Sequence, residues 1–226
     1  MSGIGILGGT FNPVHNGHLR HALEAGEALG LDRVLLLPCA EPPHKGVCNV
    51  LPFALRVDML QAAVSNIPLL EVDPLEGELA RPSYTWRTLE EWNRRHIQPG
   101  GALPYFMMGA ESFAALSRWK RGLELPRFAH LVMLPRDGED GRGFYESIRR
   151  FWPGSLEEGR PFPVSRETVA LAGGGACTFL PAPRLDISST FIRERWCAGR
   201  SVAGLVPEAA LRVLEAHAGA VRRIWP

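Results

Sequence analysis

The start of the chain narrowly limits how its first thirty residues can fold. Ile4 to Leu7 form an apolar run typical of a buried strand, and Gly8 and Gly9 follow it. Glycine lacks a Cβ, so the backbone there can turn sharply and approach a ligand closely. His15 then precedes residues 17–29, whose apolar positions recur at helical spacing. A strand, a glycine turn and a helix start would place backbone N–H groups and a positive dipole end on one spot, which suits a phosphate.

Histidines dominate the beginning of that helix. His15 and His18 lie three residues apart and can both supply ring N–H donors, and His21 follows. One alternative is that they are surface residues of a helix. Another is a metal site formed by His18 and His21, but metal sites usually recruit further Cys, Asp or Glu, and the acidic residues nearby look like a solvated helix face. The element is neither a Walker loop nor a dinucleotide fingerprint, and the whole string favours phosphate binding.

The string Gly-Gly-Thr-Phe-Asn-Pro-Val-His-Asn-Gly-His, residues 8–18, resembles the signature of the nucleotidylyltransferase superfamily. In its longer form it is similar to the nicotinate mononucleotide adenylyltransferase family of bacterial NAD synthesis. Further segments resemble that family in the same order along the chain, namely residues 42–45, 56–60, 81–85, 108–112 with Trp119, and 186–193. The resemblance thus runs from the first strand to the C-terminal helix and is weak near residues 137–177.

The resemblance implies transfer of AMP from ATP to nicotinate mononucleotide, giving deamido-NAD and pyrophosphate. Such a reaction needs aligned anions and neutralised charge rather than a nucleophilic side chain or general base, and the sequence shows no convincing nucleophile–His–Asp set. Mg²⁺ would travel with the ATP phosphates, and we assign it no protein ligand. Open alternatives are adenylylation of nicotinamide mononucleotide or of another small molecule, and a non-catalytic nucleotide-binding sensor.

The family's site residues carry over by resemblance, position by position. The expected catalytic residues are His15, His18 and Arg193. The expected ATP-binding residues are these three with Gly8, Gly9, Thr10, Phe11, Gly109, Glu111, Ile187, Ser188 and Ser189. The expected mononucleotide-binding residues are Asn12, Lys45, Tyr84, Thr85, Trp119 and Arg136.

Individual residues support or qualify this assignment. Ser188 or Ser189 is a natural N-cap for a helical run that starts near Phe191. Glu111 stands where the family usually has aspartate, and its carboxylate can still accept from a ribose hydroxyl. Trp86 and Arg87 replace the small apolar residue and the acid that usually follow Ser-Tyr-Thr, which alters the surroundings of the acceptor.

Strand-like and helical runs alternate along the chain. This rhythm predicts an α/β fold with a doubly wound, Rossmann-like parallel sheet and helices on both faces. The motifs begin where strands end, and such sheets bind ligands beyond the carboxyl ends of their strands. Expected strands are residues 4–8, 33–38, 69–72, 105–108 and 129–134, and expected helices are residues 17–29, 53–65, 84–96, 144–152 and 191–197.

Residues 137–177 interrupt this rhythm with turn-like and glycine-rich stretches. We expect one domain over residues 1–226 with an insertion around 137–177. A surface elaboration is the favoured interpretation, and a lid or an oligomer contact is the alternative. As a surface elaboration, roughly residues 140–172 should be replaceable by a short linker without loss of fold or activity.

Composition excludes some classes of function. A net charge of +1 does not support bulk binding to nucleic acid or membranes. No apolar run reaches the roughly 20 residues of a membrane helix, and the first strand leaves no room for a signal peptide. The four cysteines, Cys39, Cys48, Cys177 and Cys197, are scattered and read as free thiols. We therefore expect a cytoplasmic protein, whose assembly into a homo-oligomer the sequence leaves open.

Overall fold

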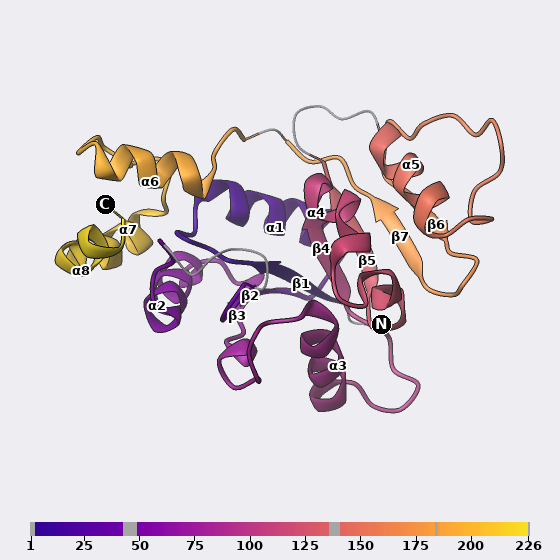
Figure 1. The fold of residues 1–226 in the computed structure, drawn as a ribbon, viewed down its shortest axis with the longest axis horizontal. Helices are drawn as coiled ribbons and strands as arrows, with labels where there is room; N and C mark the ends of the chain where they lie inside the picture. The colour runs from indigo at the N-terminus through magenta and orange to yellow at the C-terminus, as the bar shows by residue number, and fades with distance from the viewer. Residues whose placement is uncertain (1–2, 43–48, 136–140, 184, 226) are drawn as a thin grey trace.

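A sheet of seven strands forms the centre of the protein (Figure 1). The structure is a computed structural model, and it describes residues 3–42, 49–135, 141–183 and 185–225. The strand order is β3-β2-β1-β4-β5-β7-β6, and every neighbouring pair is parallel except β6 with β7. The strands are β1 (Ile4–Gly9), β2 (Arg33–Pro38), β3 (Leu70–Val72), β4 (Tyr105–Gly109), β5 (His130–Leu134), β6 (Glu167–Ala170) and β7 (Ala176–Phe179).

Helices cover both faces of this sheet, so the predicted doubly wound fold is confirmed. The α-helices are α1 (Asn16–Leu29), α2 (Phe53–Val64), α3 (Thr85–His96), α4 (Ala110–Ala114), α5 (Arg142–Phe151), α6 (Ser189–Cys197), α7 (Glu208–Ala216) and α8 (Ala218–Ile224). Short 3₁₀ turns are η1 (Leu75–Gly77), η2 (Leu116–Arg118) and η3 (Gly122–Arg127). Within the described residues, no helix is long and apolar enough to cross a membrane.

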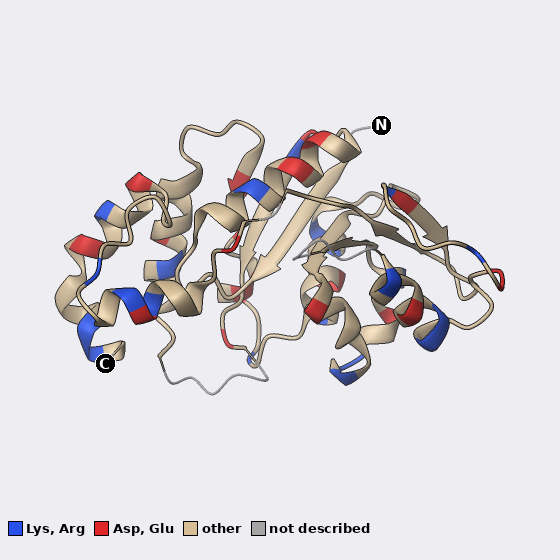
Figure 2. Cartoon of the chain, turned by 90° about the horizontal axis from the view of Figure 1, so that it is seen from above, with Lys and Arg blue, Asp and Glu red and all other residues tan. Residues whose placement is uncertain are grey.

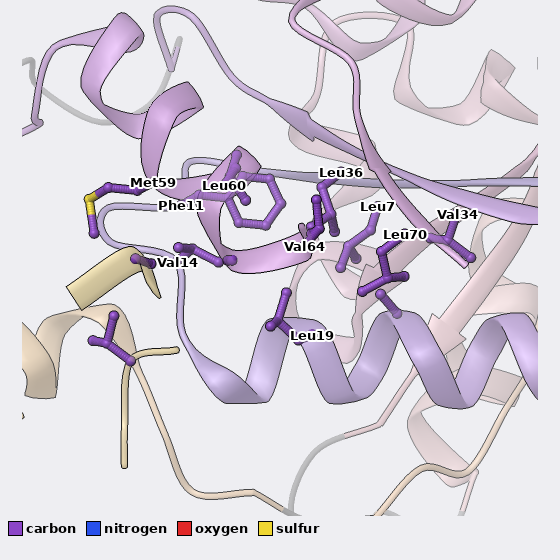
Figure 3. Close-up of a cluster of buried hydrophobic side chains, with 14 of the residues drawn as sticks. Leu7, Phe11, Val14, Leu19, Val34, Leu36, Met59, Leu60, Val64 and Leu70 are labelled. Carbon is purple, nitrogen blue, oxygen red and sulfur yellow. The ribbon is translucent and has the colours of Figure 1, made fainter. Parts of the chain in front are cut away.

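Two apolar clusters form the core, one on each face of the sheet. Successive strand residues point to opposite faces, so Ile6 and Leu7 of β1 belong to different clusters. Figure 3 shows Leu19 of α1 and Leu60 of α2 packed toward the sheet in the cluster that α7 also joins. The opposite cluster is formed with α3, α4 and α5. Nearly continuous apolar runs such as β2 are required because both faces of this strand are buried.

The segment 137–177 is more than a surface elaboration, so that expectation is wrong for its described part. Helix α5 buries Phe144, Tyr145 and Ile148 completely in the second cluster. Strand β7 pairs with β5 on one side and β6 on the other, so it extends the central sheet. A linker in place of 140–172 would remove β6 and α5 and expose this core. The linker replacement should therefore abolish folding rather than be tolerated.

Replacing Ile148 with valine tests this directly. Ile148 is fully buried, and Ile→Val at such a site costs about 0.5–1.5 kcal/mol. The melting temperature should fall by about 2–4 °C per kcal/mol in a chain of this size. Val164→Ala in the same segment is the control, because Val164 is 86% exposed and should leave the melting temperature unchanged. Equal melting temperatures for both variants and the parent would restore the surface interpretation.

The helices after the sheet gather at one end of the molecule. Figure 1 shows α6, α7 and α8 at the end opposite to α5 and β6. Ala210 and Leu214 of α7 pack into the cluster that contains Met59 and Leu60 of α2. In the view of Figure 2, the positions of basic and acidic residues are interspersed over the helices. Any site for an anion must therefore be built from a local group of cations and backbone donors.

Candidate active site

The carboxyl ends of the parallel strands place the predicted motifs along one edge of the sheet. Gly9 at the end of β1 is in register with Pro38 at the end of β2. On the other side, Gly109 at the end of β4 is in register with Leu134 of β5. The predicted residues that follow β1 and β4 therefore share one end of the sheet, where such folds bind ligands. They are Thr10, Phe11, Asn12, His15, His18 and Glu111.

His15 and His18 form a stacked pair at the start of α1. Their ring centroids are 3.6 Å apart at an interplanar angle of 24°, and Phe11 contacts His18 edge-on. The backbone N–H of His15 donates to Nδ1 of His18 at 3.2 Å. Since Nδ1 accepts there, a neutral His18 ring carries its proton on Nε2, the nitrogen that can donate to a phosphate. His15 is only 3% exposed, so the surface interpretation does not hold for it.

Gly17 leaves the space that the His15 ring of this pair occupies. A Cβ at this position would lie 3.0 Å from Nδ1 of His15 and 3.7 Å from the carbonyl oxygen of Ile187. Any larger residue would therefore press on the His15 ring. The same contact places Ile187, a predicted ATP-binding residue, beside the start of α1.

Helix α6 joins the β1–α1 turn through its first residues. Ser188 is its N-cap, as predicted, and its hydroxyl accepts from the backbone N–H of Phe191 at 3.1 Å. The hydroxyl of Ser189 donates to the carbonyl oxygen of Pro13 at 2.8 Å. Arg193 donates from Nη1 to the carbonyl oxygen of Asn12 at 2.8 Å and from Nη2 to Thr190 Oγ1 at 3.0 Å. The positive ends of α1 and α6 therefore lie at the same turn, a favourable site for anions.

The segment 83–85 lies on the β2 side of this edge. The backbone N–H of Glu41 donates to Ser83 Oγ at 3.1 Å, and the N–H of Ser83 returns a bond to the Glu41 carbonyl oxygen at 3.0 Å. Tyr84 is the extended residue before α3, and Thr85 is the first residue of that helix. Both side chains are half-buried. Lys45 and Arg136, the two predicted cations of this region, lie outside the described residues.

Cations surround the aromatic residues at the start of α3. The ammonium of Lys120 lies 4.8 Å from the ring centroid of Tyr84, and the guanidinium of Arg87 lies 5.6 Å from it. The guanidinium of Arg121 lies 4.4 Å from the ring centroid of Trp86. Trp119 is half-buried against the second cluster, directly before Lys120 in the chain. These contacts make the surroundings of Tyr84 positive, which sequence motifs alone did not predict.

Glu111 and Gly109 stand where the sequence predicted them. Gly109 ends β4 and precedes α4, and Glu111 is exposed in the first turn of that helix. Its carboxylate is thus accessible to a ligand at the edge of the sheet.

Asn12 is buried and its side chain is used within the protein. Its Nδ2 donates to the carbonyl oxygen of Asn49 at 2.7 Å, and its Oδ1 accepts from the backbone N–H of Leu51 at 2.9 Å. Asn12, which the sequence predicted to bind the mononucleotide, therefore also links the loop after β1 to the loop between β2 and α2. The amide nitrogen carries two N–H donors, and one of them donates to Asn49. The second N–H can donate to a ligand.

Arg56 is a site residue whose role the sequence did not reveal. It is 1% exposed on α2, and its guanidinium donates to four carbonyl oxygens, those of Leu51 (2.9 Å), Thr10 (2.7 Å), Cys39 (2.7 Å) and Ala40 (3.3 Å). It therefore joins the loops after β1 and β2 to the start of α2. Burial lowers the pKa of Arg56, with the neighbouring arginine Arg81 acting in the same direction.

Two further polar residues, the half-buried Cys39 and the buried Glu76, lie next to this arginine. Burial, together with Glu76, raises the pKa of Cys39 to about 12, so the thiol stays protonated and unreactive at neutral pH. Glu76 accepts from the backbone N–H of Ala40 at 3.0 Å and from Thr88 Oγ1 at 2.8 Å.

Within the described residues, no three His, Cys, Asp or Glu side chains are grouped closely enough to hold a metal ion.

Comparison with known proteins agrees with this geometry. The family model described as cytidylyltransferase-like matches residues 6–195. A protein of Pseudomonas aeruginosa, named as a probable nicotinate-nucleotide adenylyltransferase, is 39% identical over 215 residues, which are 95% of this chain and 95% of the relative. A protein of Pelobacter propionicus with the same name is 37% identical over 204 residues, 90% of this chain and 91% of the relative. The chain belongs to the nicotinate-nucleotide adenylyltransferase family.

Solved structures show the same fold. The nicotinic acid mononucleotide adenylyltransferase of Plasmodium falciparum, complexed with NaAD, aligns with a TM-score of 0.70 and 15% identity over 96% of both chains. The same enzyme complexed with APC aligns with a TM-score of 0.67, 16% identity and the same coverage. At this identity, the comparison shows that this adenylyltransferase family member shares their fold.

Proposed function

We propose that the chain transfers AMP from ATP to nicotinate mononucleotide, forming deamido-NAD and pyrophosphate in NAD biosynthesis. The observation that carries this proposal is the meeting of His15, His18 and Arg193 at one turn, where α1 and α6 both begin. The naming of the relatives supports the same reaction.

In this mechanism the protein aligns two anions and neutralises charge. A phosphate oxygen of the mononucleotide attacks the α-phosphorus of ATP, the new P–O bond forms, and the bond to pyrophosphate breaks. His18 and Arg193 supply donors to the phosphates as negative charge accumulates on the leaving group. Backbone N–H groups at Gly9, Thr10 and the start of α1 hold the same phosphates, so the reaction needs no covalent intermediate on the protein. Mg²⁺ bound to the phosphates would offset part of their charge when ATP enters.

Pyrophosphate release separates this function from nucleotide binding alone. The purified protein with ATP, Mg²⁺ and nicotinate mononucleotide should release pyrophosphate, and omission of the mononucleotide should stop the release. Binding of ATP without release in the presence of nicotinate or nicotinamide mononucleotide would favour the non-catalytic sensor instead. Release that requires neither mononucleotide would indicate another acceptor.

The surroundings of Tyr84 support an acidic acceptor. Nicotinate differs from nicotinamide by a carboxylate in place of an amide, and Lys120 and Arg87 place positive charge over the Tyr84 ring. The first turn of α3 adds N–H donors and the positive end of a helix dipole. We propose that Tyr84, Thr85 and Trp119 surround the pyridine ring, and that the cations favour its carboxylate.

Lys120→Met is expected to weaken the preference for the acid. The variant keeps the length of the side chain and loses its charge, so the ratio of kcat/KM for nicotinate over nicotinamide mononucleotide should fall about two- to fivefold, as for an exposed, screened charge. Steady-state kinetics at low and high salt measure this, and the difference should shrink at high salt. Arg118→Met, two residues away on η2, is the control and should leave the ratio unchanged. An unchanged ratio in Lys120→Met would remove Lys120 from acceptor selection.

The cellular setting remains part of the proposal. We propose a cytoplasmic location, which the metabolic role and the scattered cysteines support; Cys39, Cys177 and Cys197 are free thiols in the structure.

A further inference from the structure

Two donors meet at one main-chain oxygen beside the candidate site. The carbonyl oxygen of Asn49 accepts from Asn12 Nδ2 at 2.7 Å and from the indole Nε1 of Trp225 at 3.0 Å. Trp225 follows α8 and is 2% exposed. The indole and its acceptor are 176 residues apart in the sequence. This bond therefore connects the helices that follow α6 to the loop between β2 and α2.

Asn12 links that loop to the phosphate end of the site. Its Oδ1 accepts from the N–H of Leu51, its Nδ2 donates to Asn49, and its main-chain oxygen accepts from Arg193. Asn49 has a φ of +67°, in the left-handed region that few non-glycine residues adopt and that asparagine tolerates better than most. The conformation of Asn49 thus depends on its contacts, and Trp225 supplies one of the two donors to its carbonyl group.

We infer that Trp225 is a positioning residue of the active site and acts through Asn49 on the side-chain amide of Asn12. This inference rests on the proposed function, in which Asn12 lies on the mononucleotide side. A carbonyl oxygen has two lone pairs, so the Asn49 oxygen accepts from Asn12 and Trp225 at once. Each of the two donors restrains the position of this shared acceptor. In a half-buried network, hydrogen bonds of this kind strengthen each other. Loss of the indole donor loosens Asn49 and with it the orientation of the Asn12 amide.

The effect should be confined to one substrate. Arg193 bonds the main-chain oxygen of Asn12, which does not move when the side-chain amide turns. The groups that hold the ATP phosphates are therefore retained. The expected signature of a lost Trp225 donor is weaker mononucleotide binding with an unchanged chemical step.

Trp225→Phe tests this, because it keeps a buried ring and removes the N–H. We expect KM for nicotinate mononucleotide to rise about three- to tenfold, the scale of one net hydrogen bond, while kcat and KM for ATP stay within about twofold. Trp92→Phe is the matched control. Trp92 is also 2% exposed, and its indole donates to Asp73 Oδ2 at 3.1 Å. Trp92→Phe therefore also removes one indole hydrogen bond, but one that does not involve Asn49. Trp225→Tyr, which also lacks the indole N–H, serves if the phenylalanine variant does not fold.

A measurement without turnover separates this inference from the proposed function. The N–H of Leu51 is held by Asn12, so its hydrogen exchange should be faster in Trp225→Phe and unchanged in Trp92→Phe. Faster exchange with no conversion of nicotinate mononucleotide by the parent protein would refute the proposed function and leave the structural link in place. Unchanged Leu51 exchange, an unchanged KM, or an equal rise of KM in Trp92→Phe would overturn the positioning role.

Discussion

His18→Ala is expected to lower kcat by about a hundredfold or more, with the fold intact. Removing one preorganised donor to a developing negative charge costs on this order in other enzymes. His18 is placed for that role because its Nδ1 accepts from the His15 N–H and its ring stacks on His15 at 3.6 Å. These contacts restrain the ring before ATP binds, and a neutral ring whose Nδ1 accepts a hydrogen bond donates from Nε2. Steady-state kinetics with saturating ATP and mononucleotide measure the loss.

His21→Ala is the control for this prediction. His21 lies on the same helix, three residues further along, and is half-buried like His18. Its replacement should leave kcat within about twofold of the parent. Near-normal turnover of a folded His18→Ala variant would contradict the assigned role, as would an equal loss in His21→Ala.

Arg193→Lys should lower kcat/KM for ATP by roughly ten- to a hundredfold. The positive charge is retained, but the planar fork that reaches both the Asn12 carbonyl oxygen and Thr190 Oγ1 is lost. A lysine cannot keep these two bonds and also present donors to pyrophosphate in a fixed direction. If kcat/KM for ATP is lower in Arg193→Met than in Arg193→Lys, the difference measures the contribution of the positive charge itself.

Arg195→Lys on the same helix provides the comparison. Arg195 donates from Nε to the carbonyl oxygen of Ser201 at 2.9 Å, so it also loses a backbone contact on substitution. It lies outside the proposed site, and its variant should retain both kcat and KM for ATP. If Arg193→Lys behaves like Arg195→Lys, Arg193 does not hold the leaving group.

The elements predicted from local pattern agree closely with the structure. The run Arg33–Pro38 is a strand with the predicted bounds, because the five apolar residues after Arg33 suit a strand buried on both faces. Ser188 caps α6 because a serine before a helical run can bond the N–H of the third residue after it. Such signals lie within a few residues of the structure they determine, so one sequence suffices to read them.

The features that escaped prediction depend on distant partners. Strands β6 and β7 have four residues each and flank the glycines 173–175, so neither carries a clear period of its own. Arg56 stands among apolar helix positions, and the carbonyl groups of two loops, the one after β1 and the one between β2 and α2, explain why a charge is buried there. The bond from Trp225 to Asn49 likewise has no local signal. The sequence motifs thus predicted the residues that meet where α1 and α6 begin, whereas the residues that hold these loops in place could be found only from the fold.

The most direct test of the central claim is a paired measurement of kcat/KM for nicotinate and nicotinamide mononucleotide with the parent protein, ATP and Mg²⁺. Charge-assisted hydrogen bonds contribute about 1.5–3 kcal/mol where neutral ones contribute less, so a site that presents donors and cations should prefer the acid by roughly tenfold to a few hundredfold. The predicted result is formation of deamido-NAD with that preference. Equal kcat/KM for the two mononucleotides, a preference for the amide, or conversion of neither would contradict it.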